Sequence, residues 1–203
     1  MDPLLLIPLL LIACWMLKSW QQGRRIALLG HFLSRHRIEK NMETLTQGYL
    51  RALGEAEPDR QQHVWGVLRP TEQELCSQVT RLASDFASAD PALVRVSLLP
   101  IWVPFSFAIF RSFDMREALA IHARGIRRAI DANAATSPRE RAFAISAELF
   151  LMQHTCHWFC RTKTVASARM LSRHQTSYDQ LVSAVTPQTR SEYLALVRHR
   201  GQA

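Results

Sequence analysis

Apolar residues recur every three or four positions along most of the chain, which is the spacing of one face of an α-helix. A clear example is the row formed by Leu75, Val79, Leu82 and Phe86. Residues 142–160 are apolar nearly all round, with Glu148 as their one charged residue, which is typical of a helix at the centre of a bundle. No segment shows a convincing two-residue alternation of the kind that marks a half-buried strand. The pattern therefore predicts an all-α fold.

Helix-start signals divide this pattern into a bundle of about six to eight helices. Residues 137–140 (Ser-Pro-Arg-Glu) combine a capping hydroxyl, a proline in the first turn and a carboxylate at the third helical position. Residues 186–187 (Thr-Pro) predict the start of the last helix in the same way. Residues 71–74 (Thr-Glu-Gln-Glu) and Asp114 followed by Glu117 match the capping pattern as well, so we expect helices to begin there.

The most apolar stretch lies at the N-terminus, where residues 4–17 contain no charged or hydrogen-bonding polar side chain. A helix rises ~1.5 Å per residue and the hydrocarbon core is ~30 Å thick, so about 20 apolar residues are needed to span it. The stretch is marginal in length, but Trp15 and Trp20 suit a membrane interface and Lys18 can extend its amine towards the headgroups. The sequence thus predicts a single-pass transmembrane helix.

Charge asymmetry orients this predicted anchor. Only Asp2 precedes the apolar stretch, whereas basic residues follow it. The positive-inside rule then places the C-terminal domain in the cytoplasm, at the bacterial inner membrane. The basic residues expected to face the anionic lipid surface are Lys18, Arg24, Arg25, Arg35 and Arg37.

We therefore expect a transmembrane anchor at residues 1–20, a basic amphipathic juxtamembrane helix at residues 21–54 and a cytosolic α-helical domain at residues 55–203. The apolar face of residues 21–54 either rests on the membrane or packs on the domain. Residues 96–110 lack charge and contain two prolines, so they form either a buried central segment or a shallow membrane-dipping one.

Two alternatives compete with the anchor. Residues 11–14 (Leu-Ile-Ala-Cys) resemble a bacterial lipoprotein box, in which Cys14 is lipidated and the helical domain lies in the periplasm. Against this alternative, no positive charge precedes the apolar run, and apolar residues continue past the cysteine. In the second alternative, the N-terminal helix packs into a protein partner.

Overall charge narrows the choice of partner. The net charge is +8, and only three of the 25 basic residues are lysines, which indicates a GC-rich genome more than a phosphate-binding surface. A membrane surface is the expected anionic partner, at ~1 kcal/mol per nearby basic residue. Nucleic acid is unlikely, because the predicted basic face lacks interleaved aromatic residues. That face comprises Arg116, Arg124, Arg127 and Arg128.

One cluster contains residue types that bind metals. On a helix, Cys156, His157 and Cys160 are three or four positions apart, so their side chains can converge as three ligands. Cys76 or His122 from another helix would complete such a site. Buried cysteines more often pack as small apolar side chains, so we expect no cofactor. A metal- or haem-binding or redox sensor stays the alternative.

No catalytic motif is found. No serine lies in the context of a nucleophile elbow, and the seven glycines are spread singly, which excludes a glycine-rich phosphate loop. We therefore expect a non-enzymatic interaction or scaffold protein, a subunit of a bacterial inner-membrane assembly with protein partners or with copies of itself. The alternatives are a periplasmic lipoprotein and a metal-binding sensor.

Overall fold

A computed structural model describes residues 3–104, 110–131 and 137–198, with side chains from Ile7 onward. Within these ranges the chain forms eight helices and two short strands. The N-terminal part contains α1 (Pro3–Leu33), α2 (Ile38–Gly54) and α3 (Pro58–Phe86). The strands β1 (Arg95–Ser97) and β2 (Ser112–Asp114) follow. The C-terminal part contains α5 (Met115–Asp131), α6 (Pro138–Cys160), α7 (Lys163–His174), α8 (Tyr178–Ala184) and α9 (Pro187–Arg198). The predicted all-α fold is confirmed.

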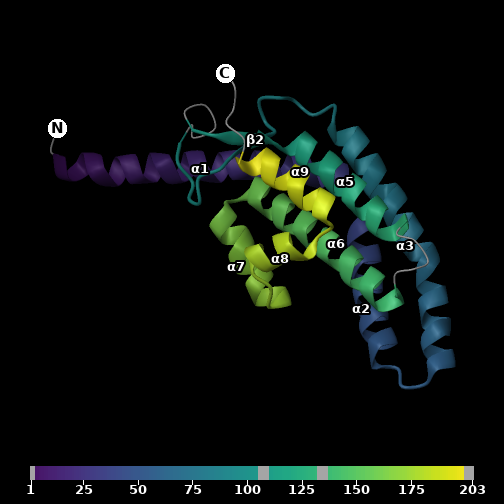
Figure 1. Ribbon diagram of the computed structural model, residues 1–203. Coiled ribbons are helices and arrows are strands. Elements are labelled where there is room, and N and C mark those ends of the chain that lie inside the picture. Colours follow the sequence, from purple (N-terminus) through teal and green to yellow (C-terminus); the bar gives the residue numbers. More distant parts are fainter. Residues whose placement is uncertain (1–2, 105–109, 132–136, 199–203) are drawn as a thin grey trace.

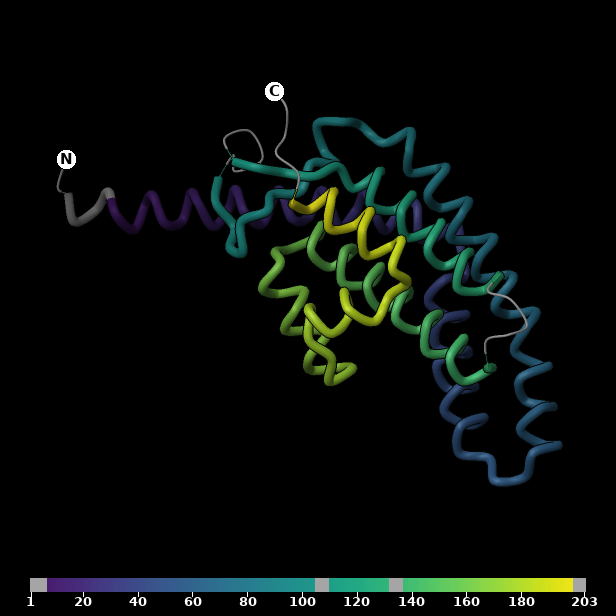
Figure 2. The backbone as a smooth tube through the Cα atoms, viewed as in Figure 1, coloured from purple at the N-terminus to yellow at the C-terminus, as the bar shows by residue number. Residues whose placement is uncertain are grey.

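The helices form a body from which α1 extends as a long rod (Figure 1). The paired helices α2 and α3 lie at the end of the body away from the N-terminus, and α7 and α8 lie below the middle of it (Figure 2). Helices α5 and α6 pack against each other between these parts, and α9 packs along α5.

Helix α6 is the central element, as its apolar sequence predicts. Ile145 and Leu149 are buried in a core shared with α2, α3 and α5. Two positions further on, Ala147 and Leu151 are buried in a second core with α7, α8 and α9. Because residues two apart point to opposite sides of a helix, α6 separates the two cores and contributes to both.

The two strands are a departure from the prediction. They pair antiparallel, with Val96 opposite Phe113, and both of these side chains are buried. The indole of Trp158 donates a hydrogen bond of 3.1 Å to the carbonyl of Ser97. Three-residue strands are too short to show alternation in a sequence, so this pairing could not be anticipated.

The predicted buried segment at residues 96–110 is buried only in part. Val96 is buried, whereas Ile101 and Phe110 are exposed. Residues 105–109 lie outside the described residues.

Helix-start predictions succeed or fail according to the tertiary context. Ser137 forms the predicted capping box, accepting from the Glu140 amide at 3.2 Å while the Glu140 carboxylate accepts from the Ser137 amide at 3.0 Å. The predicted start at residues 71–74 is wrong, because α3 continues through Pro70. Within this continuous helix, Glu72 is buried and accepts a hydrogen bond from the Tyr49 hydroxyl at 2.9 Å.

The predicted transmembrane anchor is also wrong. No helix in the described part of the chain is long and apolar enough to cross a membrane. The uncharged stretch of residues 4–17 gives about 21 Å of helix against a hydrocarbon core of ~30 Å. This finding contradicts the anchor at residues 1–20 and the single-pass inner-membrane localisation with a cytoplasmic C-terminal domain.

Candidate interaction surface

The N-terminal half of α1 extends beyond the body as an apolar helix (Figures 1 and 2). Large apolar side chains along it are 57–67% exposed: Ile7, Leu9, Leu10, Leu11, Ile12, Trp15 and Met16. Because these positions point in every direction around the helix, no face of it is polar. We call residues 7–16 the projecting segment. Helices of this composition are normally enclosed by apolar surroundings, so this segment is the strongest candidate for an interaction surface.

The C-terminal half of α1 is held firmly by the body. Leu29 and Phe32 are buried, and the Phe32 ring meets the edge of Phe86 with centroids 5.2 Å apart. Arg25 donates hydrogen bonds to the carbonyls of Arg95 at 2.6 Å and Phe159 at 3.4 Å. Of the two interpretations of residues 21–54, this part of α1 therefore follows the one in which the apolar face packs on the domain.

The five basic residues predicted to face lipid have different surroundings. Arg25 is directed at the body, as described above, and burial lowers the pKa of its guanidinium. Arg24 lies over the Trp20 ring at 4.9 Å, and Arg35 is 2.8 Å from the His31 imidazole. The remaining two, Lys18 and Arg37, are exposed.

A second apolar surface lies between α2 and α6. This groove has a volume of about 450 Å³ and is lined mainly by Leu50, Leu53, Ala142, Phe143 and Phe150. Leu50 is 67% exposed and Phe143 is 65% exposed, so large apolar groups face outward along it. Its charged residues are Arg139 and Glu140, and the Glu140 carboxylate is already bonded to Ser137. We call this surface the α2/α6 groove.

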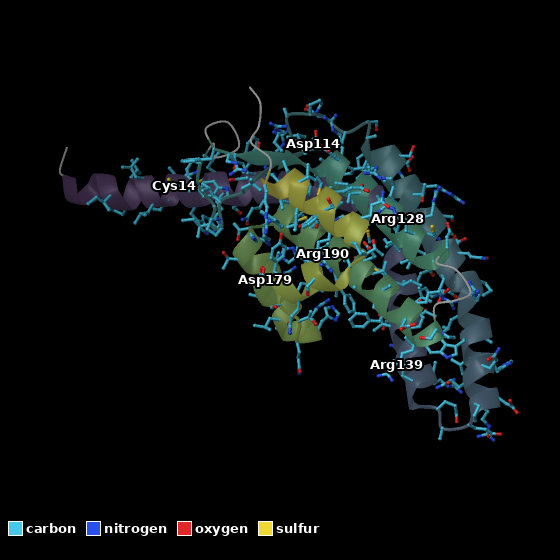
Figure 3. All side chains as sticks on the ribbon, viewed as in Figure 1. Cys14, Asp114, Arg128, Arg139, Asp179 and Arg190 are labelled. Atoms are coloured by element: carbon cyan, nitrogen blue, oxygen red, sulfur yellow. The ribbon has the colours of Figure 1, made fainter. Side chains whose placement is uncertain are left out.

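The projecting segment and the α2/α6 groove lie at opposite ends of the molecule. Figure 3 labels Cys14 on the projecting segment and Arg139 at the groove, with the body between them. The helix therefore cannot fill the groove of its own chain.

Sequence reasoning missed the groove. Its signal was present, because Leu50 lies off the face that carries Leu45, Tyr49 and Ala52 into the core.

The predicted metal cluster does not assemble into a site. Among the described residues, no three His, Cys, Asp or Glu side chains converge in a metal-binding arrangement. Burial raises the pKa of the Cys156 thiol to about 12 and that of Cys160 to about 11, which disfavours the thiolate that binds metals. His157 is 3.4 Å from the Arg169 guanidinium. Cys14, the predicted lipidation site, is exposed on the projecting segment.

A buried polar network joins α5, α6 and α9. His122 lies 2.9 Å from the Thr155 hydroxyl, and that hydroxyl is 3.3 Å from the hydroxyl of Tyr193. Burial lowers the pKa of His122 to about 3, so the imidazole is neutral near pH 7. The pKa of nearby His154 is lowered to about 4 for the same reason. The network lies inside the protein, away from both apolar surfaces.

Glu148, the one charged residue among residues 142–160, is buried in α6 and contacts the start of α9. Its carboxylate accepts from the amide and the hydroxyl of Thr186 at 3.1 and 2.9 Å. Burial is the largest influence on its pKa and raises it. The carboxylate thus has a structural role and stabilises the N-terminus of α9.

Comparison with known proteins identifies no relative. The chain matches no protein-family model, no curated protein and no solved structure.

Proposed function

We propose that this protein is a non-catalytic helical scaffold that assembles with copies of itself. The projecting segment of one copy lies in the α2/α6 groove of the next. The observation that supports this proposal is the presence, in one chain, of an exposed apolar helix and an exposed apolar groove that cannot meet within the same molecule.

The two surfaces agree in length and charge. Residues 7–16 extend over about 14 Å of helix, and the α6 wall of the groove, residues 139–150, extends over about 17 Å. The projecting segment has no charged residue, so no charge is buried when it docks. The groove keeps Arg139 at one end, where it can stay in water.

The expected affinity is modest. One face of the helix places three or four large side chains in the groove, at about 1.5–3 kcal/mol for each full burial. The sum is comparable with the estimated ~4–15 kcal/mol that association costs in lost freedom of motion. We therefore expect reversible assembly. A contact between two different surfaces extends head to tail, into rings or filaments.

Analytical ultracentrifugation of the full chain tests the proposal. Wild type should show a concentration-dependent increase in mass. Leu11→Glu, on the projecting segment, and Phe143→Glu, in the groove, should each abolish it, because each buries a carboxylate at the contact. Val67→Glu is the matched control: Val67 is 60% exposed on α3 and does not line the groove, so this variant should assemble like wild type.

Mixing the two assembly-deficient variants gives a sharper test. The intact groove of Leu11→Glu can accept the intact helix of Phe143→Glu, so the mixture should form a dimer of one copy of each and nothing larger. If Phe143→Glu assembles normally, the helices pair with each other and the groove is not the acceptor. Wild-type protein that stays monomeric but floats with phosphatidylglycerol vesicles would contradict self-assembly and indicate that the projecting segment binds lipid.

A further inference from the structure

A pocket with both polar and apolar walls, separate from the assembly surfaces, lies where α6, α7, α8 and α9 meet. Its volume is about 330 Å³, at the lower end of the ~300–1,000 Å³ range of small-molecule sites. Trp158, Tyr178 and Leu194 contribute apolar surface to its walls. Figure 3 labels Asp179 and Arg190, which line it from α8 and α9.

Lys163 is the polar group best placed in this pocket. Its amine lies 4.1 Å from the centre of the Tyr178 ring and 5.3 Å from that of Trp158. The two rings hold the amine at the pocket wall by cation–π attraction. In the described part of the chain, Lys163 forms no ion pair with a carboxylate. Burial lowers the pKa of the Lys163 amine, and the nearby Asp179 carboxylate opposes this shift.

The pocket carries an excess of positive charge. Arg190 and Arg198 line it together with Lys163, and Asp179 is the acidic residue among its described lining residues. Arg190 is fixed by donating to the carbonyls of Val182, at 3.0 Å, and Ser183 at the end of α8. Two positive charges therefore stay unbalanced in a partly apolar cavity, where a negative group gains more than in open water.

We infer that this pocket binds a small organic anion with an apolar body, such as an aromatic or aliphatic monocarboxylate. The carboxylate accepts a hydrogen bond from the Lys163 amine, and the apolar body lies against Trp158, Tyr178 and Leu194. This orientation follows from the pocket, because the cations and the apolar side chains line the same cavity. The inference is independent of self-assembly.

Isothermal titration calorimetry of the full chain with 4-phenylbutyrate tests this inference. Wild type should bind it, and should bind the uncharged 4-phenyl-1-butanol at least about tenfold more weakly, since a hydrogen bond to a charged group contributes ~1.5–3 kcal/mol. Lys163→Met keeps most of the stem and removes the charge, so it should weaken 4-phenylbutyrate binding by about tenfold or more. Lys40→Met, which removes an exposed amine on α2, should bind like wild type.

Filling the pocket provides a second variant. Leu194→Trp places a larger side chain in the cavity and should abolish binding. Its circular dichroism spectrum and melting temperature should stay close to those of wild type. Equal affinity for the acid and the alcohol in wild type would overturn the inference without any variant. Unchanged binding by Lys163→Met or by a folded Leu194→Trp would place the ligand elsewhere and overturn it as well.

Discussion

Gly125, in the middle of α5, lies where side chains of α6 and α9 leave no room for a β-carbon. A β-carbon added there would lie 2.5 Å from the Thr189 hydroxyl oxygen and 2.9 Å from the carboxyl carbon of Glu148. Neither group can move aside freely, because the Glu148 carboxylate is bonded to Thr186 and the Thr189 hydroxyl is 2.8 Å from the Thr186 hydroxyl. Gly125→Ala should therefore separate α5 from α6 and α9.

The size of this effect follows from opposing contributions. Replacing glycine by alanine inside a helix favours folding by about 1 kcal/mol. Overpacking costs about 1–3 kcal/mol, and each displaced hydrogen bond about 1 kcal/mol more. We expect a net loss of about 2 kcal/mol, which lowers the melting temperature by about 4–8 °C in a chain of this length.

Thermal and urea unfolding followed by circular dichroism measures the change. Gly66→Ala is the matched control, because Gly66 is an exposed glycine inside α3 with no atom within 4 Å of the added carbon. The control should gain about 0.5–1 kcal/mol. If Gly125→Ala is as stable as the control, the close packing of α5 on Glu148 and Thr189 is refuted.

Three further predictions concern other parts of the body. Burial holds the pKa of His122 at about 3 in the folded protein, against about 6.5 in the unfolded chain. The contribution of neutral His122 to the free energy of unfolding is therefore complete above pH 6.5 and is lost as pH falls towards 3. The loss is about 2 kcal/mol at pH 5. Urea unfolding of His122→Gln should show a shallower acid dependence than wild type, and an unchanged slope would contradict this. The buried Glu72 carboxylate is 3.6 Å from the Arg141 guanidinium, so Arg141→Met removes its cation. The free energy of unfolding, measured with urea, should fall by about 3 kcal/mol, and adding Glu72→Gln should largely restore it. Gln175 ends α7 with a φ of 50°, so Gln175→Gly should raise stability by about 0.5–1 kcal/mol, and a loss of stability would argue against this left-handed conformation.

Features that depend on neighbouring residues were predictable from the sequence. The all-α fold, the capping box at Ser137 and the start of α9 after Thr186 depend on spacing and on side chains three positions away. The central place of α6 was also predictable, because a helix that is apolar on all sides has no polar face to turn outward.

Other features depend on contacts between distant segments. Burial of Leu68 and Leu75 on either side of Pro70 keeps α3 continuous through a residue that usually ends a helix. The buried Glu72 carboxylate accepts its hydrogen bond from the Tyr49 hydroxyl, 23 positions away, which no local pattern indicates.

For the interaction surfaces, the sequence by itself determined that residues 4–17 are apolar and helical, but not what surrounds them. The tertiary structure decided that the projecting segment stays outside both cores and that Leu50 and Phe143 face a groove. The physical reason is that periodicity defines which side chains share a face of a helix, whereas the packing of other helices decides whether that face is covered. The Lys163 pocket is decided in the same way, because its walls come from four helices that only the fold brings together.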